Sequence, residues 1–250
     1  MENKQEQIKV KVRNMTKKFG DLLVLNDISF DVKAGEFLCV VGPTGCGKTT
    51  FLNCLTNLYP PTAGQILVDD VPVDLRKQNI AYIFQEYSTM PWLTVEENVA
   101  YGLKIKKVPK EDAKRAVDEV LEVVGLDQFR KFYPGEISAS MQQRVVIARA
   151  FATKPDLLLM DEPYGQLDID LRFRLEDELL KLWRSNGTTV IFITHNIEEA
   201  VYLSQDILVL TNKPTTIKKM IHNPLPQPRN VVSPEFAALR DEVTELIKWW

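Results

Sequence analysis

The chain has 250 residues, of which 45% are hydrophobic and 26% charged, a balance typical of a packed globular protein and not of a disordered one. Its formal net charge of -3 provides no overall positive field for a phosphate backbone, so nucleic-acid binding is not expected. The three cysteines, Cys39, Cys46 and Cys54, show no paired spacing and favour a reducing compartment.

The first residues contain no apolar segment followed by a small-residue cleavage site, so no export signal is expected. The apolar runs have strand length and fall short of the roughly 20 residues that a membrane-spanning helix needs. If this protein serves a membrane, another chain must cross it.

Short β-rich segments open the chain and predict an antiparallel start around one buried strand. From Pro91 to Thr153 the apolar spacing becomes helical, and Gly125 is placed to end a helix. Strands then return, interleaved with an amphipathic helix that Gly187 stops, which predicts a mostly parallel sheet with helices on both faces. The expected strands are 8–12, 22–25, 28–32, 37–41, 65–68, 157–160, 190–194 and 207–210.

After Leu210 the chain becomes rich in proline, and a final amphipathic stretch runs from Pro234 to Trp250. We expect this tail to be a surface strap that ends in a short helix.

The segment GPTGCGKTT follows the strand at 37–41 and leads into a helix whose last apolar position is Leu58. Strand, glycine loop and helix in this order are the context that the Walker A phosphate-binding pattern requires. Loop N–H groups would point at phosphate oxygens, Lys48 would bring a positive charge to the β and γ phosphates, and Thr49 a hydroxyl to Mg²⁺. The alternative is that these glycines form an ordinary turn by chance. The strand before the loop and the helix after it argue against this alternative. The loop residues predicted to contact nucleotide are Gly42, Pro43, Thr44, Gly45, Cys46, Gly47, Lys48, Thr49 and Thr50.

A second strand ends in two carboxylates, Asp161 and Glu162. Parallel strands of one sheet end at the same edge, so Asp161 is predicted to hold the Mg²⁺ near Thr49 and Glu162 to act as general base on the attacking water. A third strand ends at His195, which alone would be interpreted as a structural histidine. At the same edge it becomes a candidate γ-phosphate contact.

From Val10 to about Leu210 the sequence resembles the ATP-binding cassette (ABC) ATPases, in the family's motif order. The segments QEYSTMPWLTVEENVAYGL, DEPYGQLD, THNIEEAVYLSQDILVL and SPEFAALR are similar to the nitrate/sulfonate/taurine group of bacterial importers. The resemblance implies an α/β fold in one nucleotide-binding domain over residues 1–250. Its expected parts are a P-loop NTPase (RecA-like) core with an antiparallel β-subdomain at 1–85 and 156–210, an inserted helical subdomain at 86–155, and the tail at 211–250.

The same resemblance assigns further residues. Phe19, which without the resemblance would be interpreted as an ordinary core or turn residue, becomes the aromatic that stacks on adenine. Gln85 becomes the sensor of Mg²⁺ and the γ phosphate. Asp168 becomes a contact across a dimer interface, and His195 the switch histidine. The stretch 87–92 corresponds to the surface that takes the permease's coupling helix. The expected catalytic residues are Lys48, Gln85, Glu162 and His195, and the expected metal ligands are Thr49, Gln85 and Asp161.

One segment departs from the family's signature, LSGGQ or LSGGM, because ISASM stands at residues 137–141. In the family this loop crosses to the partner subunit's ATP, where the serine hydroxyl and glycine N–H groups touch the γ phosphate. Ser138 and the N–H of Ser140 remain as nucleotide contacts, but the Cβ atoms of Ala139 and Ser140 restrict backbone conformation and close approach. We therefore expect a weaker closing half-site.

The resemblance implies a peripheral ATPase on the cytoplasmic face of the cell membrane, with ATP and Mg²⁺ as cofactors. Its expected partners are a second ATPase chain in a homodimer or heterodimer, a polytopic membrane permease and, indirectly, an extracytoplasmic substrate-binding protein. The transported solute would be small, polar and often anionic, and its identity stays open because no residue of this chain faces it.

Three alternatives compete with this interpretation. A soluble ABC protein of DNA repair or translation would carry two cassettes or a long coiled-coil insertion. A regulatory subunit that barely hydrolyses ATP gains support from the altered signature, against which Glu162 and His195 count. A P-loop kinase would lack the signature-region and histidine-loop matches.

Overall fold

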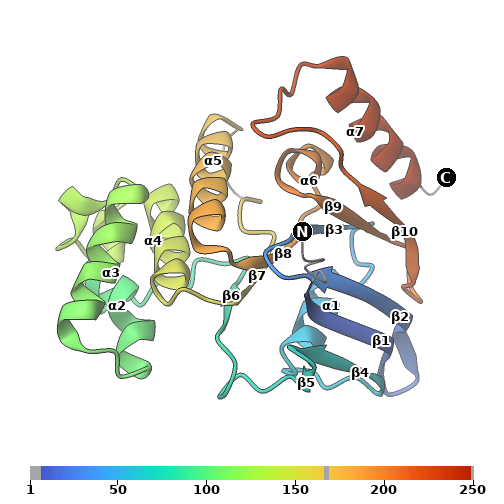
Figure 1. The fold of residues 1–250 in the computed structure, drawn as a ribbon, viewed down its shortest axis with the longest axis horizontal. Helices are drawn as coiled ribbons and strands as arrows, with labels where there is room; N and C mark the ends of the chain where they lie inside the picture. The colour runs from blue at the N-terminus through green and yellow to red at the C-terminus, as the bar shows by residue number, and fades with distance from the viewer. Residues whose placement is uncertain (1–6, 166–168, 249–250) are drawn as a thin grey trace, which may run out of the picture. The chain divides into compact units, whose positions relative to one another are not determined.

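The structure is a computed structural model that describes residues 7–165 and 169–248 (Figure 1). The chain divides into two compact units: unit 1 comprises residues 1–78 and 189–250, and unit 2 comprises residues 79–188. Within the described ranges, no helix has both the length and the apolar composition needed to cross a bilayer.

Unit 1 contains an antiparallel sheet in the order β2-β1-β4-β5. Its strands are β1 (Ile8–Phe19), β2 (Leu22–Lys33), β4 (Ala63–Val68) and β5 (Val71–Pro72). The prediction of two strands at 22–25 and 28–32 is wrong, because β2 is continuous. Its polar middle, which resembles a turn in the sequence, is accommodated by Asp27 with a φ of 52° and by shifts in the register with β1.

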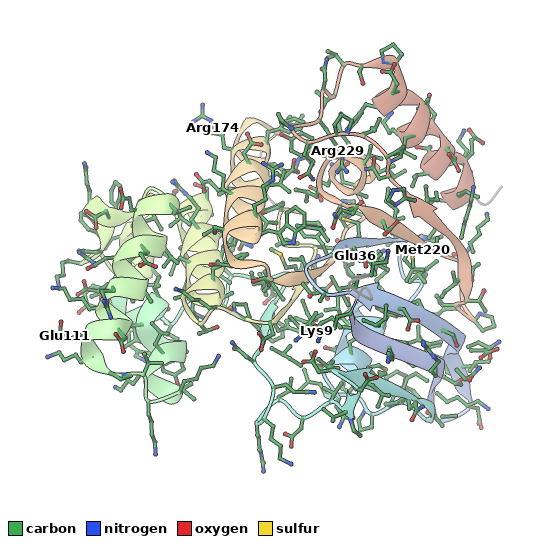
Figure 2. All side chains as sticks on the ribbon, viewed as in Figure 1. Lys9, Glu36, Glu111, Arg174, Met220 and Arg229 are labelled. Atoms are coloured by element: carbon green, nitrogen blue, oxygen red, sulfur yellow. The ribbon has the colours of Figure 1, made fainter. Side chains whose placement is uncertain are left out.

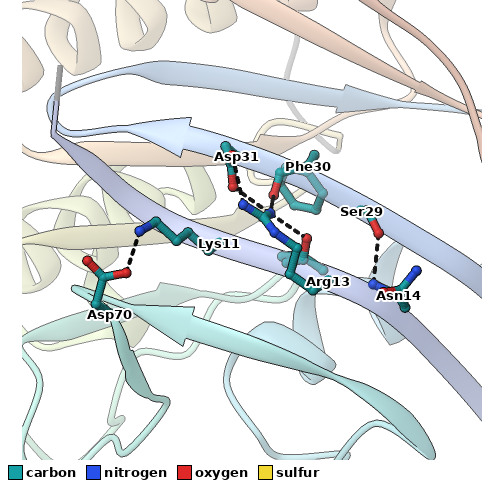
Figure 3. A network of polar contacts seen from close by, with 8 residues as sticks. Lys11, Arg13, Asn14, Ser29, Phe30, Asp31 and Asp70 are labelled. Carbon is teal, nitrogen blue, oxygen red and sulfur yellow. Dashed lines mark hydrogen bonds and ion pairs between the residues drawn. The ribbon is translucent and has the colours of Figure 1, made fainter. Parts of the chain in front are cut away.

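Charged pairs lie on the polar face of this sheet (Figure 3). Arg13 donates through Nη1 and Nη2 to the two carboxylate oxygens of Asp31 at 2.6 and 2.9 Å, and Lys11 pairs with Asp70. Exposed pairs of this kind contribute only about 0–1 kcal/mol each. Their main effect is to specify which face of the strands meets solvent, so that the alternating apolar residues meet the core.

Unit 1 also contains four strands in the order β10-β9-β3-β8. They are β3 (Phe37–Val41), β8 (Thr189–Ile193), β9 (Asp206–Leu210) and β10 (Ile217–His222). β3 is buried throughout and pairs in parallel with β8 and β9, whereas β10 pairs antiparallel with β9. The helices of unit 1 are α1 (Lys48–Leu55), α6 (Ile197–Leu203) and α7 (Pro234–Ile247). α6 packs on β3, and α7 packs on α6 and β9.

Two predictions about unit 1 need correction. The tail is more than a strap with a helix, because its first part forms β10 at the edge of the sheet. The final helix itself is present: Ser233 caps α7 by accepting the Phe236 N–H at 3.2 Å. The helix after the phosphate loop ends at Leu55, so Leu58 lies beyond it and is exposed.

Unit 2 contains a parallel strand pair and a cluster of helices. The strands are β6 (Ile80–Ile83), which was not among the predicted strands, and β7 (Leu157–Asp161). The helical elements are α2 (Val95–Ile105), α3 (Lys110–Val123), η1 (Asp127–Phe129), η2 (Pro134–Glu136), α4 (Ala139–Ala152) and α5 (Ile169–Asn186). α2, α3 and α4 pack against one another, as Figure 1 shows. Gly125 follows α3 with a φ of 65°, as predicted. The two units together confirm the α/β class with mostly parallel central strands and an antiparallel N-terminal sheet.

A buried carboxyl at the amino end of β3 makes the stability of unit 1 sensitive to pH. Glu36 is 7% exposed and accepts the Lys33 N–H at 2.6 Å (Figure 2). Burial raises the pKa of Glu36 to about 7, and the neighbouring carboxylate of Asp206 adds to this increase while the Lys33 N–H opposes it. Asp206 in turn lies 2.9 Å from His222 Nδ1.

We predict that Glu36→Gln stabilises the protein at high pH. Because the folded-state pKa lies above the unfolded value of about 4.3, the folded state binds the proton more tightly, and stability falls as pH rises through about 4.5 to 7. The amide mimics the protonated acid, so the variant should gain roughly 1–3 kcal/mol at pH 8 and almost nothing at pH 4. Urea unfolding at both pH values measures this, with the exposed Glu122→Gln as control. An unchanged pH dependence in Glu36→Gln would contradict the assignment.

Candidate functional site

The phosphate loop, residues 42–47, joins the buried strand β3 to helix α1. Lys48 is the first residue of α1 and is buried, and its ammonium group donates to the carbonyl oxygens of Gly42 at 3.1 Å and Pro43 at 3.3 Å. No side chain of the described residues caps the start of α1. Helix N–H groups without a cap, together with the helix dipole, form a site for an anion.

Two glycines of the loop have different steric surroundings. Gly47 has a φ of 109°, and a Cβ there would lie 2.9 Å from Val24 Cγ1. Gly45 has a φ of 75°, and a Cβ there would have nothing within 4 Å. Thr44 and Thr49 are exposed beside them. The loop is therefore packed against β2 on the side of Gly47 and open on the side of Gly45.

Thr215 holds the loop from the other side. It is completely buried, and its hydroxyl donates to the carbonyl of Cys46. Its backbone N–H donates to the Val24 carbonyl at 2.9 Å, and its own carbonyl accepts the Asn26 N–H at 2.8 Å. The turn between β9 and β10 thus ties the phosphate loop to β2. Thr215 lies in the proline-rich tail, where no local pattern in the sequence predicts this role.

Phe19 lies at the end of β1 and is 43% exposed. Its ring meets Tyr59 edge-on, with the centroids 5.7 Å apart, and Lys17 Nζ lies 4.9 Å from its centroid. A surface aromatic is what stacking on a base requires, whereas a core aromatic would be inaccessible.

His195 comes two residues after the last residue of β8 and is exposed. β8 pairs with β3 in parallel, with Ile193 opposite Val40, so His195 lies at the same sheet edge as the start of the phosphate loop. The next residue, Asn196, caps α6 by accepting the N–H of Glu198 at 2.9 Å.

In unit 2, Asp161 ends β7 and is buried. Burial raises the pKa of Tyr82 of β6, and the nearby negative charge of Asp161 adds to this increase. The phenol therefore keeps its proton near the carboxylate, a proximity that the sequence does not predict.

Glu162 and Gln85 lie just beyond this pair. Glu162 has a φ of 45°, a left-handed conformation that is rare outside glycine and that concentrates at functional sites. Gln85 is exposed and follows β6, which pairs in parallel with β7. The structure thus brings Gln85, Asp161 and Glu162 to one strand edge within unit 2.

The altered signature begins helix α4. Ser138 is its N-cap, since Oγ accepts the Met141 N–H at 3.3 Å, and Oγ also lies 2.9 Å from Ser140 Oγ. Ala139 and Ser140 form the first turn of α4, where a right-handed backbone suits any L-residue. Their Cβ atoms therefore do not restrict the backbone here, contrary to expectation. Of the two expected effects, only the steric hindrance to close approach to a partner subunit's ATP still applies. Asp168 lies outside the described residues.

A buried strand, a glycine-rich loop and an uncapped helix start in unit 1, and a parallel strand in unit 2 that ends in two carboxylates, define the class of P-loop nucleotide-hydrolysing proteins. The ABC transporter family model matches residues 25–165. The chain is 41% identical over 245 residues to an uncharacterized ABC transporter ATP-binding protein of Methanocaldococcus jannaschii, covering 96% of this chain and 92% of that protein. It is 44% identical over 230 residues to an aliphatic sulfonates import ATP-binding protein of Bacillus thuringiensis subsp. konkukian, covering 92% and 90%.

A solved dimeric ATP-binding cassette, in a post-hydrolysis state with ADP and Pi, matches with a TM-score of 0.74 at 31% identity, over 85% of this chain and 98% of that one. The chain belongs to the ABC transporter family. It is an ATPase whose hydrolysis is coupled to transport across a membrane.

We predict that Gly47→Ala destabilises the phosphate loop more than Gly45→Ala does. Both substitutions place a side chain at positive φ, at a cost of about 1–2 kcal/mol, but only the Gly47 variant also forces Val24 and its strand to shift. Thermal unfolding and binding of a fluorescent ATP analogue should both be impaired more strongly for Gly47→Ala. Equal losses in the two variants would show that packing against β2 does not shape the loop.

Proposed function

We propose that this chain is the ATP-hydrolysing subunit of an importer that takes up a small, polar, often anionic solute through a separate permease. The single observation that carries the hydrolytic assignment is the phosphate loop, with Lys48 buried at an uncapped helix start. The importer assignment is supported by the 44% identity to aliphatic sulfonates import ATP-binding proteins. The solute class is taken from these relatives.

The chain offers suitable donors for nucleotide and metal. Lys48 and the loop N–H groups are suited to the phosphates, and Phe19 to adenine. Among the described residues no cluster of three or more His, Cys, Asp or Glu side chains forms a metal site. A divalent ion would instead be held by the hydroxyl of Thr49, the carboxylate of Asp161 and the amide of Gln85, a set of hard oxygen donors that suits Mg²⁺. When bound, Mg²⁺ supplies charge neutralisation at the phosphate oxygens.

Glu162 is proposed to accept the proton of the attacking water. Its neighbour Asp161 is buried at the end of β7, near the neutral phenol of Tyr82, whereas Glu162 lies beyond the strand. This division leaves Glu162 as the group available for general-base chemistry. His195, exposed at the edge shared with the phosphate loop, is proposed to contact the γ phosphate.

The site is proposed to be completed by a second ATPase chain, as in the dimeric cassette to which this chain is similar. The homodimer would carry two altered half-sites with Ser138 and Ser140, and a heterodimer could combine an altered and an ordinary one. Asp168 is proposed to contact the partner. The altered signature also favours a second candidate function, an ATP-binding regulatory subunit that hydrolyses weakly.

The permease is proposed to dock on the helical part, residues 86–155. In unit 2 the exposed aromatic side chains include Trp92, which is 72% exposed, and Phe132 and Tyr133. The backbone N–H of Val95 donates to the Phe132 carbonyl at 2.9 Å, so the segment before α2 and the loop after η1 are held together. Aromatic surfaces of this kind are typical of protein interfaces. Docking there would keep the chain at the cytoplasmic face of the membrane.

We expect Glu162→Gln to abolish turnover while preserving ATP binding. The amide keeps the shape of the side chain but cannot accept a proton, and general-base catalysis contributes on the order of 10²- to 10⁴-fold. ATPase assays and equilibrium ATP binding measure the two effects, and copurification of a polytopic membrane protein with the wild-type chain tests the transporter role. Near-normal turnover in Glu162→Gln would remove Glu162 as the base.

The effect of the altered signature is measurable separately. Restoring Ala139→Gly and Ser140→Gly together should raise ATP turnover of the assembled transporter at saturating ATP, because both Cβ atoms that obstruct close approach are removed. In a Glu162→Gln background the same double change should strengthen ATP-driven dimerisation, read by analytical ultracentrifugation. If neither quantity increases, the two side chains do not weaken the half-site.

A further inference from the structure

The segment between β6 and α2, residues 84–94, carries Gln85 and has no regular secondary structure. A loop of this length is fixed only where other groups satisfy its backbone. In unit 2 those groups include Asn98 in α2 and side chains of the helix α4 that begins at the signature.

Asn98 is completely buried and binds the loop through both ends of its amide. Its Oδ1 accepts the Met90 N–H at 2.8 Å. Its Nδ2 lies 3.1 Å from the Met90 carbonyl oxygen and 2.9 Å from those of Leu93 and Thr94. The carboxyl-terminal half of the loop is therefore attached to the first turn of α2.

Arg149 extends this attachment to α4. Its Nη1 donates to the Ser88 carbonyl at 2.7 Å, its Nη2 to Asn98 Oδ1 at 2.6 Å and its Nε to the Asn98 carbonyl at 3.0 Å. These acceptors are neutral, and burial lowers the pKa of Arg149. A half-buried guanidinium that makes three hydrogen bonds to neutral oxygens is held in one geometry, which the flexible point charge of lysine cannot reproduce.

A second bond joins the loop to the same helix closer to the signature. The hydroxyl of Thr89 donates to Gln142 Oε1 at 3.1 Å, and Gln142 Nε2 donates to the Pro134 carbonyl at 3.0 Å. Gln142 lies one residue after the signature segment 137–141. α4 thus contacts the Gln85 loop at both its first turn and its third.

We infer that Arg149 is a positioning residue for hydrolysis, which fixes the loop bearing Gln85 to the helix that presents Ser138, so that the two nucleotide-facing segments of unit 2 move as one body. The inference rests on the proposed role of Gln85 at the γ phosphate and Mg²⁺. Arg149 itself touches neither. Its effect is transmitted through the carbonyl of Ser88, three residues from Gln85.

Arg149→Lys in the full-length chain tests this inference. The lysine keeps the charge but loses the planar fork, so the Gln85 loop is displaced, and a displacement near 1 Å costs about 10²-fold in rate. We expect kcat to fall about 10- to 100-fold with the KM for ATP changed less than threefold. The matched control is Arg144→Lys on the same helix, because Arg144 donates to the Val124 carbonyl at 2.9 Å, away from the loop. Thermal unfolding of both variants is measured in parallel.

A double-mutant cycle with Gln85→Ala separates positioning from a general loss of packing. If Arg149 acts through Gln85, Arg149→Lys lowers kcat in the wild-type background and leaves the rate of the Gln85→Ala variant unchanged. An equal fold loss in both backgrounds, or no loss in either, overturns the inference. If Gln85→Ala alone leaves kcat unchanged, the proposed role of Gln85 fails, and this inference fails with it.

Thr89→Val keeps the test decisive if Arg149→Lys does not fold. It removes only the bond to Gln142 and should lower kcat by a smaller factor, about 3- to 10-fold, again only when Gln85 is present. Loss of the same size in the Gln85→Ala background would show that these bonds serve stability alone.

Discussion

The chain must hold several backbone N–H groups open toward a ligand inside an otherwise packed unit, and much of unit 1 is arranged around this constraint. A loop that presents N–H groups to a ligand has fewer groups to spare for bonds within the chain, so other contacts have to fix it. Here β3 anchors the loop in the sheet, Val24 packs beside Gly47, and Thr215 binds the Cys46 carbonyl. Two segments distant in sequence, β2 and the turn between β9 and β10, thus hold the loop that follows β3, and α1 starts there without a side-chain cap.

Local patterns were sufficient to predict the features that local physics determines. The buried runs of β3, β7 and β8, the phosphate loop and the glycine that ends α3 all follow from residues within a few positions of one another. The features that were predicted wrongly or not at all depend on residues far apart in the sequence. Whether β2 continues through Asp27 depends on its neighbour β1, β10 exists because β9 offers an edge, and Thr215 meets Cys46 across 169 residues. Tyr82 and Arg149 were not predicted for the same reason. Neither belongs to a sequence motif, and the surroundings of each come from residues distant in the chain.

The altered signature shows how a motif and a structure can lead to different physical accounts of one substitution. From the sequence, the loss of two glycines predicts a more restricted backbone and hindered close approach, and so a weaker half-site. The structure places Ala139 and Ser140 in the first turn of a helix that Ser138 caps, where glycine has no conformational advantage and alanine is the better helix former. The departure therefore stabilises α4 by itself and can weaken activity only through the space that the side chains occupy against a partner.

Protonation and nucleotide chemistry act at opposite ends of the same strand. Glu36 and Asp206 lie at the amino ends of β3 and β9, whereas the phosphate loop leaves the carboxyl end of β3. At about 3.3 Å per residue, the five residues of β3 separate these ends by about 16 Å. Two unit charges at that distance interact by about 1 kcal/mol at an effective dielectric constant of about 20, which is less than one pKa unit. Direct electrostatic coupling between the two ends is therefore small, and any larger influence of the acidic pair on the nucleotide site has to pass through the packing of β3. The stability of unit 1 and the chemistry at its phosphate loop can consequently respond to pH independently, even though both depend on this one buried strand.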